Sequence, residues 1–421
     1  MGISAVEKFL LSVMALAVLC LRPSVIGEVY SIFSLALLLG AATALFGVSL
    51  STGRVLVPER FAVINITLIY LISLYVLTRT ILFMPAIDAT DETKAFMIIS
   101  GFLLAVLLVI SNRAYATTFF DALAILVIAS SISLTITMVL LLAGIPAYQL
   151  TIGKIAYTYA NRGDFAFPFT FLYNEVSTPF GVIPRLSGVF REPGIFPLYG
   201  CWAAAYAYRR GWPTPIWLVC LFATAACLSS IGAPLALYTG AMIVMIRAGI
   251  KPLPALLLLL VVGLLTWQIL YTSEYLDLQS KVNSGSGSFE ERMYLAEAAF
   301  DASNVIFGDG YGFSIFTTGP ISLVAAIRVF GLVFFVGFLI CYALAAVDLK
   351  LWMTGLVPPI LGVVFTQPVF REPGFMIMLF SGIVFIASKP SFSALPSRRD
   401  PVARTGAFRL KNPLLENPLG R

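Results

Sequence analysis

Apolar runs about as long as a bilayer is thick recur along the chain, and they constrain its fold more than any other feature. Helices satisfy all backbone polar groups inside lipid, and about 20 apolar residues cross the hydrocarbon core. Only 11% of the residues are charged, whereas about 25% is usual for soluble proteins. The sequence therefore predicts an all-α polytopic membrane protein with about twelve transmembrane helices. The predicted spans are residues 9–21, 29–50, 61–84, 95–111, 118–145, 194–208, 213–229, 231–247, 252–272, 320–346, 351–367 and 374–388.

The distribution of basic residues predicts which side of the membrane each connection occupies. With the N-terminus placed in the cytoplasm, most of the 27 lysines and arginines fall in the inner segments. This satisfies the positive-inside rule, so both termini are predicted to be cytoplasmic. Residues 1–388 then form one transmembrane domain. Residues 389–421 are basic and rich in proline, and they are predicted to be a disordered cytoplasmic tail near anionic lipid.

Two outer connections are long, residues 146–193 and 273–319, whereas the others are short. Long loops held by a helical frame tend to carry function. We therefore expect the active part of the molecule on the extracytoplasmic side.

The six residues VFREPG occur twice, at 189–194 and again at 369–374. Each copy directly precedes an apolar segment, and Pro193 and Pro373 are predicted in the first turn of the helices that follow. Arg191 and Arg371 add full positive charges where the helix N-termini carry partial ones. Two such helix starts side by side would form an anion site.

Other charged residues complete this predicted site. Arg185 lies six residues before Arg191, and Arg292 lies in the second long loop. Glu192 and Glu372 are candidate general bases, since a carboxylate near an apolar boundary can hold a raised pKa. The alternative is structural: each glutamate neutralises its neighbouring arginine, and all four residues face lipid headgroups.

Two arginines fall inside predicted spans, towards their outer ends. Arg79 and Arg328 would either reach the outer interface or line a path for a lipid-linked phosphate. The glycine-rich GDGYG at 308–312 lies on the outer side and follows no βαβ strand. It is therefore interpreted as a helix stop and turn and not as a dinucleotide fingerprint.

The chain has no histidine, and its five cysteines all lie in apolar runs. Histidine-based acid–base catalysis and histidine metal ligation are therefore excluded. Buried thiols act as small apolar side chains, so we expect the cysteines to pack and not to ligate. We expect no metal and no cofactor.

These motifs resemble a known family. The sequence RLSGVFREPG at 185–194, Glu291-Arg292 and FGDGYG at 307–312, with about twelve spans, is similar to the O-antigen polymerase and ligase superfamily. The resemblance covers residues 185–331 and the topology. It implies that Arg185, Arg191 and Arg292 engage the pyrophosphate of an undecaprenyl-linked glycan. The ligase branch has a histidine after its glycine motif, where this chain has Thr318-Gly319-Pro320, so the resemblance favours a polymerase.

The resemblance implies a metal-independent glycosyl transfer on the periplasmic face of the bacterial inner membrane. A sugar hydroxyl of one lipid-linked repeat unit attacks the anomeric carbon of another, and undecaprenyl pyrophosphate leaves. Arginines would stabilise the leaving group, and a carboxylate would deprotonate the hydroxyl. Membrane lipids, a chain-length regulator and a flippase are the expected partners, and no nucleic acid is expected.

Two other functions fit the same residues. The first is a ligase that transfers a glycan to another acceptor. The second is a transporter or flippase for lipid-linked glycans, because the two VFREPG copies precede spans 6 and 12 of two six-span halves. The transporter predicts superposable halves and a cavity that opens to either side.

Overall fold

A computed structural model describes residues 3–54, 56–83, 90–155, 163–178, 181–250, 254, 261, 263–265, 304–309 and 322–386. The chain separates into two units, residues 1–386 and 387–421. The predicted tail, 389–421, lies outside the described residues, and its disorder stays a prediction.

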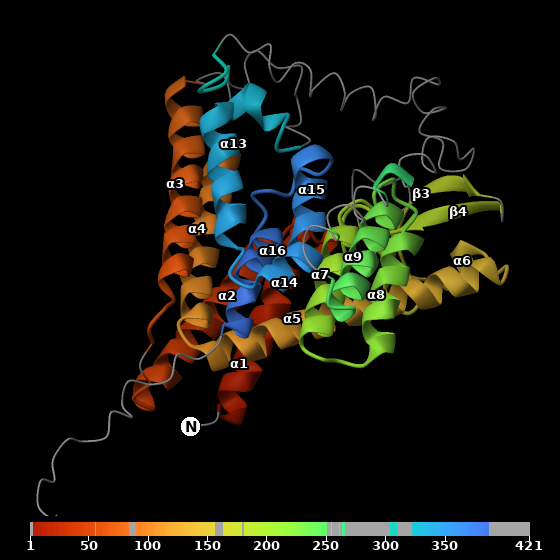
Figure 1. Ribbon diagram of the computed structural model, residues 1–421, viewed down its shortest axis with the longest axis horizontal. Helices are drawn as coiled ribbons and strands as arrows, with labels where there is room; N and C mark the ends of the chain where they lie inside the picture. Colours follow the sequence, from red (N-terminus) through yellow and green to blue (C-terminus); the bar gives the residue numbers. More distant parts are fainter. Residues whose placement is uncertain are drawn as a thin grey trace, which may run out of the picture. The chain divides into compact units, whose positions relative to one another are not determined.

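Five helices in the described part are long and apolar enough to cross a membrane (Figure 1). They coincide with predicted spans to within a few residues, which confirms a helical membrane protein. The count of twelve spans and the side of each terminus stay predictions, and most of the predicted span 252–272 lies outside the described residues. The helices of this first part are α1 (Ala5–Leu19), α2 (Val25–Ser51), α3 (Arg60–Phe83), α4 (Thr90–Ile110), α5 (Arg113–Leu142) and α6 (Ala147–Leu150).

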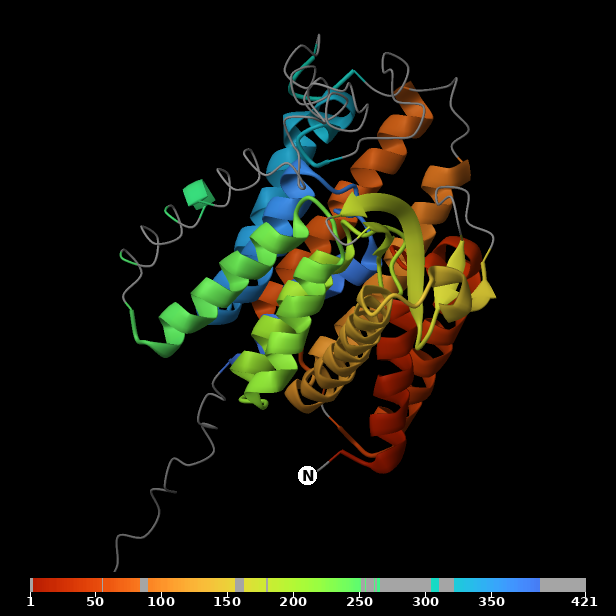
Figure 2. The same cartoon turned by 90° about the vertical axis from the view of Figure 1, so that its right-hand side faces the viewer.

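Apart from α13, which packs on α3, the later helices are shorter, and several of them pack around α7 (Phe196–Arg209). Every residue of α7 from Phe196 to Ala207 is buried, as expected for a helix that is covered on all sides. It packs against α5, α8, α9 and α15, and Figure 2 shows α8 and α9 lying side by side. The remaining elements are α8 (Thr214–Ala226), α9 (Gly232–Arg247), α13 (Ala326–Leu344), α14 (Leu349–Leu351), the π-helix η2 (Trp352–Leu356), α15 (Val357–Phe365), α16 (Pro373–Met376) and the 3-10 helix η3 (Ile377–Phe385).

The prediction of an all-α fold is wrong in one region. The first long loop, 146–193, forms a four-stranded antiparallel sheet in the order β1-β2-β3-β4. Its strands are β1 (Thr151–Lys154), β2 (Asp164–Ala166), β3 (Thr170–Thr178) and β4 (Gly181–Leu186). The segment is rich in aromatic and β-branched residues, which favour a pleated surface. It is too short and too polar to span lipid, so these residues pair with each other.

The sheet is fixed to the C-terminal half of α5 by short hydrogen bonds. The Ser133 hydroxyl lies 2.9 Å from the Thr170 hydroxyl and also accepts a hydrogen bond of 2.9 Å from the Phe169 N–H. The Thr137 hydroxyl donates to the Phe167 carbonyl at 2.8 Å. Because α5 is a candidate membrane span, these contacts hold the sheet at the end of the helical frame.

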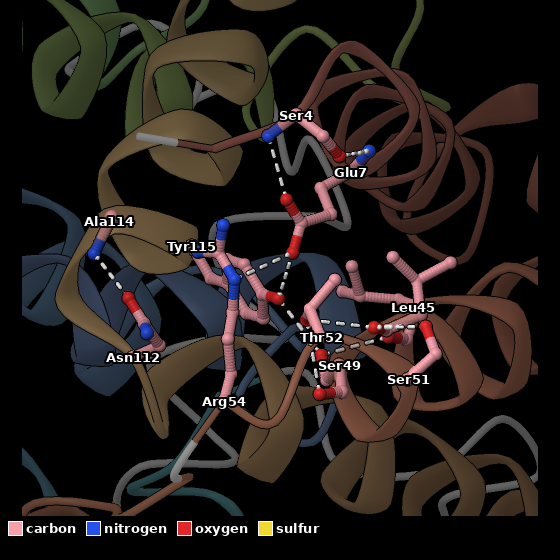
Figure 3. Close-up of polar contacts among 11 residues, drawn as sticks. Ser4, Glu7, Leu45, Ser49, Ser51, Thr52, Arg54, Asn112, Ala114 and Tyr115 are labelled. Carbon is pink, nitrogen blue, oxygen red and sulfur yellow. Dashed lines mark hydrogen bonds and ion pairs between the residues drawn. The ribbon is translucent and has the colours of Figure 1, made fainter. Parts of the chain in front are cut away.

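A buried polar cluster joins α1 to α2 and α5 at the opposite end of α5 (Figure 3). Ser4 and Glu7 form a capping box that begins α1. The same Glu7 carboxylate accepts a 2.5 Å hydrogen bond from Tyr115 and lies 3.2 Å from the Arg54 guanidinium. The Ser49 hydroxyl lies 2.8 Å from that of Tyr115. One carboxylate therefore ties the start of the chain to two other helices.

Candidate functional site

The turn between α1 and α2, residues 22–25, binds the first VFREPG copy through the backbone, and we call it the strap. The Val25 N–H donates to the Val189 carbonyl at 3.0 Å, and the Arg191 N–H donates to the Pro23 carbonyl at 3.2 Å. Phe190 forms an isolated antiparallel bridge with Ser24. The first copy therefore lies on the strap as a short extra strand.

The second VFREPG copy contacts the same strap. The Gly374 N–H donates to the Arg22 carbonyl at 3.3 Å. A nitrogen of the Arg191 guanidinium, Nη1, lies 4.0 Å from Oε1 of Glu372, so a charge from each copy faces the other. Both side chains are mostly buried. The predicted convergence of the two copies is therefore observed, although each copy meets the other's charge and not its own neighbour's.

Arg371 is held by a residue that the sequence did not single out. Its guanidinium makes a two-pronged interaction with the carboxylate of Glu92 in the first turn of α4, with distances of 3.2 and 2.6 Å. Both side chains are mostly buried. This geometry is the strong form of an arginine–carboxylate contact. The contact with Glu92 is thus consistent with a structural role for Arg371, and its role in substrate binding stays a prediction.

The two prolines of the repeat do not behave alike. Pro373 begins α16, with Glu372 as the N-cap, as expected. Pro193 instead lies in a turn, because α7 begins at Phe196 with Pro197 in its first turn. The prediction of two equivalent helix starts is therefore wrong, and α16 has only four residues. The charged side chains, and not helix termini, carry the electrostatics here.

Arg185 lies opposite an irregularity in the sheet. Leu172 pairs with Leu186 and Glu175 pairs with Pro184, so two residues of β3, Tyr173 and Asn174, oppose the single Arg185 of β4. Such a β-bulge re-aims side chains and is common near functional sites. The Nε atom of Arg185 is buried, and it has no hydrogen-bond partner in the part of the chain that the structure describes.

The charges of Glu192, Arg185 and Arg191 all affect the pKa of the Tyr173 hydroxyl. Burial raises the pKa of the Tyr173 hydroxyl, the Glu192 charge raises that pKa further, and the charges of Arg185 and Arg191 oppose the rise. These three charged residues therefore lie near enough to the Tyr173 hydroxyl to influence it, and its half-buried ring packs on the small core of Val25 and Phe171. The phenol stays protonated at neutral pH and can donate a hydrogen bond.

Glu192 and Arg185 differ from the other charged residues of this region. Among the described residues, Arg191 faces Glu372 and Arg371 pairs with Glu92. Neither the Glu192 carboxylate nor the Arg185 guanidinium makes a salt bridge with any residue in the described ranges. The reading in which Glu192 neutralises its neighbour Arg191 therefore finds no support. These two side chains are available to a ligand.

Arg79 and Arg328 both contact residues 308 and 309 of the second long loop. The Arg328 guanidinium lies 3.2 Å from the Asp309 carboxylate, and Arg79 donates to the Gly308 carbonyl. The Asp309 N–H donates to the Arg328 carbonyl at 2.8 Å. These contacts anchor residues 304–309 to α3 and α13. Substrate binding by Arg79 and Arg328 stays a prediction, and so does the role of Arg292, which lies outside the described residues.

The sequence analysis missed the strap, Tyr173 and Glu92. The one signal for the strap was Pro23, which follows directly on a predicted span. The sequence around Tyr173 or Glu92 does not mark either residue, because their importance comes from contacts with residues elsewhere in the chain.

No family model, no curated protein and no solved structure matches this chain.

Proposed function

We propose that the protein is a glycosyltransferase of the bacterial inner membrane that polymerises oligosaccharide repeat units carried on undecaprenyl pyrophosphate. The observation that carries the proposal is the pair formed by Arg185 and Glu192. One cation and one carboxylate, neither in a salt bridge among the described residues, both act on the phenol of Tyr173, and the β-bulge places Arg185 opposite Tyr173. Transfer from a diphosphate-linked sugar needs these two groups, an anion partner and a base.

The chemistry can be assigned to residues. The hydroxyl of the acceptor sugar attacks the anomeric carbon of the donor sugar as the bond from that carbon to the phosphate oxygen breaks. Glu192 accepts the hydroxyl proton, and undecaprenyl pyrophosphate leaves with the bonding electron pair. Arg185 and Arg191 stabilise the negative charge that develops on the leaving oxygen. The ring of Tyr173 offers a sugar an apolar face and one hydroxyl donor.

The Arg191–Glu372 contact is suited to a site that opens for an anion. Its 4.0 Å separation is long for a charge-assisted hydrogen bond, which is typically about 2.7–2.9 Å. A bound diphosphate offers Arg191 two closer oxygens. The convergence of both copies on the strap supplies the rigid frame that such a site needs.

The proposal is tested by the length of polymer made in cells or by purified protein with a lipid-linked repeat unit. We expect Arg185→Ala and Glu192→Gln each to lower polymerisation at least tenfold at normal protein levels. Lys154→Ala is the matched control, because Lys154 is 76% exposed on the same sheet and should leave polymerisation unchanged. Normal polymer in both test variants would reject the assignment. Transfer of a single unit to a different acceptor would identify the ligase alternative instead.

A further inference from the structure

A cavity of about 240 Å³ lies between α1, the start of α2 and α5. Its walls are almost entirely hydrocarbon, from residues such as Leu16, Leu19 and Leu126. Protein cores are packed without voids of this size. A cavity of about 150 Å³ already stays dry and accepts benzene, so this one has room for roughly one or two five-carbon isoprene units.

The cavity opens on the side of the bundle that the bilayer would cover. Two of its lining residues, Leu16 of α1 and Phe169 of the sheet, are 43% and 45% exposed. Ala129 of α5 also lines it and is exposed. Because α5 is a candidate membrane span, a hydrocarbon chain in the bilayer reaches this opening without crossing water.

The inner end of the cavity adjoins the candidate site. Ser24 of the strap lines it, and so does Val189 of the first VFREPG copy. Val189 is two residues before Arg191 and is bound to the strap by the hydrogen bond from Val25. A ligand with a charged head at Arg191 can therefore place the first part of an apolar tail here.

We propose that this cavity binds the head-proximal isoprene units of a polyprenyl diphosphate, with the chain leaving to the bilayer between α1 and α5. The inference rests on the proposed function for the identity of the ligand's head. A polyprenyl diphosphate carries its single chain directly on the anion, so a head at Arg191 and isoprene units beside Val189 can be bound together. A phospholipid separates its phosphate from its acyl chains by a glycerol and two polar ester groups, which the almost wholly apolar cavity does not match.

A native thiol gives a direct readout. Cys20 lines the cavity and is partly accessible, whereas the other four cysteines are buried. The experiment follows N-ethylmaleimide labelling by intact mass on the full chain in phosphatidylcholine nanodiscs. We expect farnesyl diphosphate to slow labelling of Cys20 at least tenfold and inorganic pyrophosphate to leave the rate unchanged. Cys20→Ala should abolish the fast labelling.

A second pair of variants tests the cavity without relying on Cys20. Ala129→Trp places a large ring at the opening and should weaken farnesyl diphosphate binding at least tenfold. Ile125→Trp is the matched control, because Ile125 is 56% exposed on the same helix and does not line the cavity. Melting temperatures of both variants show whether either has simply lost its fold.

The outcomes separate the two proposals. No protection of Cys20 by farnesyl diphosphate in the unaltered protein would overturn the cavity assignment. Equal protection by phosphatidylglycerol would also overturn it, because an ordinary acyl chain would then be the occupant. If farnesol protects as well as farnesyl diphosphate, and Arg185→Ala changes neither, the chain site stands and the diphosphate role of the proposed function fails.

Discussion

The guanidinium of Arg191 faces the carboxylate of Glu372 at 4.0 Å, although the two residues belong to different copies of the repeated hexapeptide. Each copy binds the strap through its own backbone hydrogen bonds. The repeat therefore builds one local structure from two distant parts of the chain. Because the contact is long, we expect it to add little to stability.

The first prediction concerns that contact. In a double-mutant cycle, Arg191→Ala and Glu372→Ala should show a coupling of about 1 kcal/mol or less in the free energy of unfolding. Arg191→Ala should nevertheless abolish polymerisation. Chemical unfolding in detergent measures the coupling, and polymer length measures the activity. A coupling of several kcal/mol with normal polymer would make the pair a structural one.

The second prediction concerns the shorter contact of the other copy. Glu92→Ala leaves Arg371 mostly buried without its two-pronged partner, and should cost about 2–3 kcal/mol, towards the lower end for a broken buried pair. Lys154→Ala breaks the longer, 3.5 Å contact between Asp164 and a lysine that is 76% exposed, and should cost less than about 1 kcal/mol. Comparison of the two unfolding curves checks the prediction. Equal effects would show that the Arg371–Glu92 contact adds nothing beyond a surface pair.

The positions of the helices could be predicted because membrane spans depend on local composition. The predicted span 61–84 corresponds to α3 at Arg60–Phe83, and 194–208 corresponds to α7 at Phe196–Arg209. The sheet in 146–193 was missed because its strands are short, and a strand as short as β2 (Asp164–Ala166) shows no clear alternation of apolar and polar residues. Lys154, for example, pairs with Asp164, ten residues further along the chain.

The candidate site could be predicted only in part. The repeated VFREPG sequence identified Arg191 and Glu372 as candidate site residues, and the RLSGVFREPG motif identified Arg185. The sequence could not show that Arg191 would face Glu372, or that Tyr173 would lie among the charges of the first loop. These relationships depend on how the strap brings separate segments together, which no local pattern encodes.

The third prediction tests how tightly the second copy packs. A β-carbon on Gly374 would lie 2.7 Å from the Tyr199 hydroxyl and 3.2 Å from the Arg22 carbonyl oxygen. Gly374→Ala should therefore cost about 1–3 kcal/mol by overpacking. The Tyr199 hydroxyl is buried and has no hydrogen-bond partner among the described residues, so Tyr199→Phe alone should be neutral or slightly stabilising.

The double variant Gly374→Ala/Tyr199→Phe is the decisive one. Removal of the hydroxyl relieves the closest contact, so the double variant should recover about half of the lost stability. Thermal unfolding of all four proteins gives the comparison. If the stability changes of the two single variants simply add in the double variant, the second VFREPG copy does not pack against Tyr199 as described.

The fourth prediction concerns the cluster at the start of the chain. Glu7 accepts hydrogen bonds at both carboxylate oxygens, from the Ser4 N–H at 2.7 Å and from the Tyr115 hydroxyl at 2.5 Å. Glu7→Gln turns one of these acceptors into a donor and should cost about 1–3 kcal/mol. Ser51→Ala removes only an exposed hydroxyl of α2 and should be nearly neutral. A neutral Glu7→Gln would show that the cluster does not hold α1 in place.

The last prediction concerns the contact between the second long loop and α13. Gly331 interrupts α13 with a φ of 82°, in the left-handed region that favours glycine. A β-carbon there would lie 2.2 Å from the Ile306 carbonyl oxygen and 2.4 Å from the Phe307 carbonyl carbon. The Leu332 N–H also donates to the Val305 carbonyl at 2.9 Å. The backbone of residues 305–307 therefore contacts the backbone of α13 at Gly331, and a side chain at position 331 would push the two segments apart.

Gly331→Ala should cost about 2–4 kcal/mol, from the strained φ and the overlap with backbone atoms that cannot move aside. Gly337→Ala is the matched control on the same helix, because its β-carbon would meet only the flexible Ile72 side chain, at 2.8 Å, and should cost roughly 1 kcal/mol. Unfolding curves give these values. Because Arg292 belongs to the loop that makes this contact, Gly331→Ala should also reduce polymerisation, whereas Gly337→Ala should not. Equal costs for the two alanines would mean that the loop does not rest on α13 through Gly331.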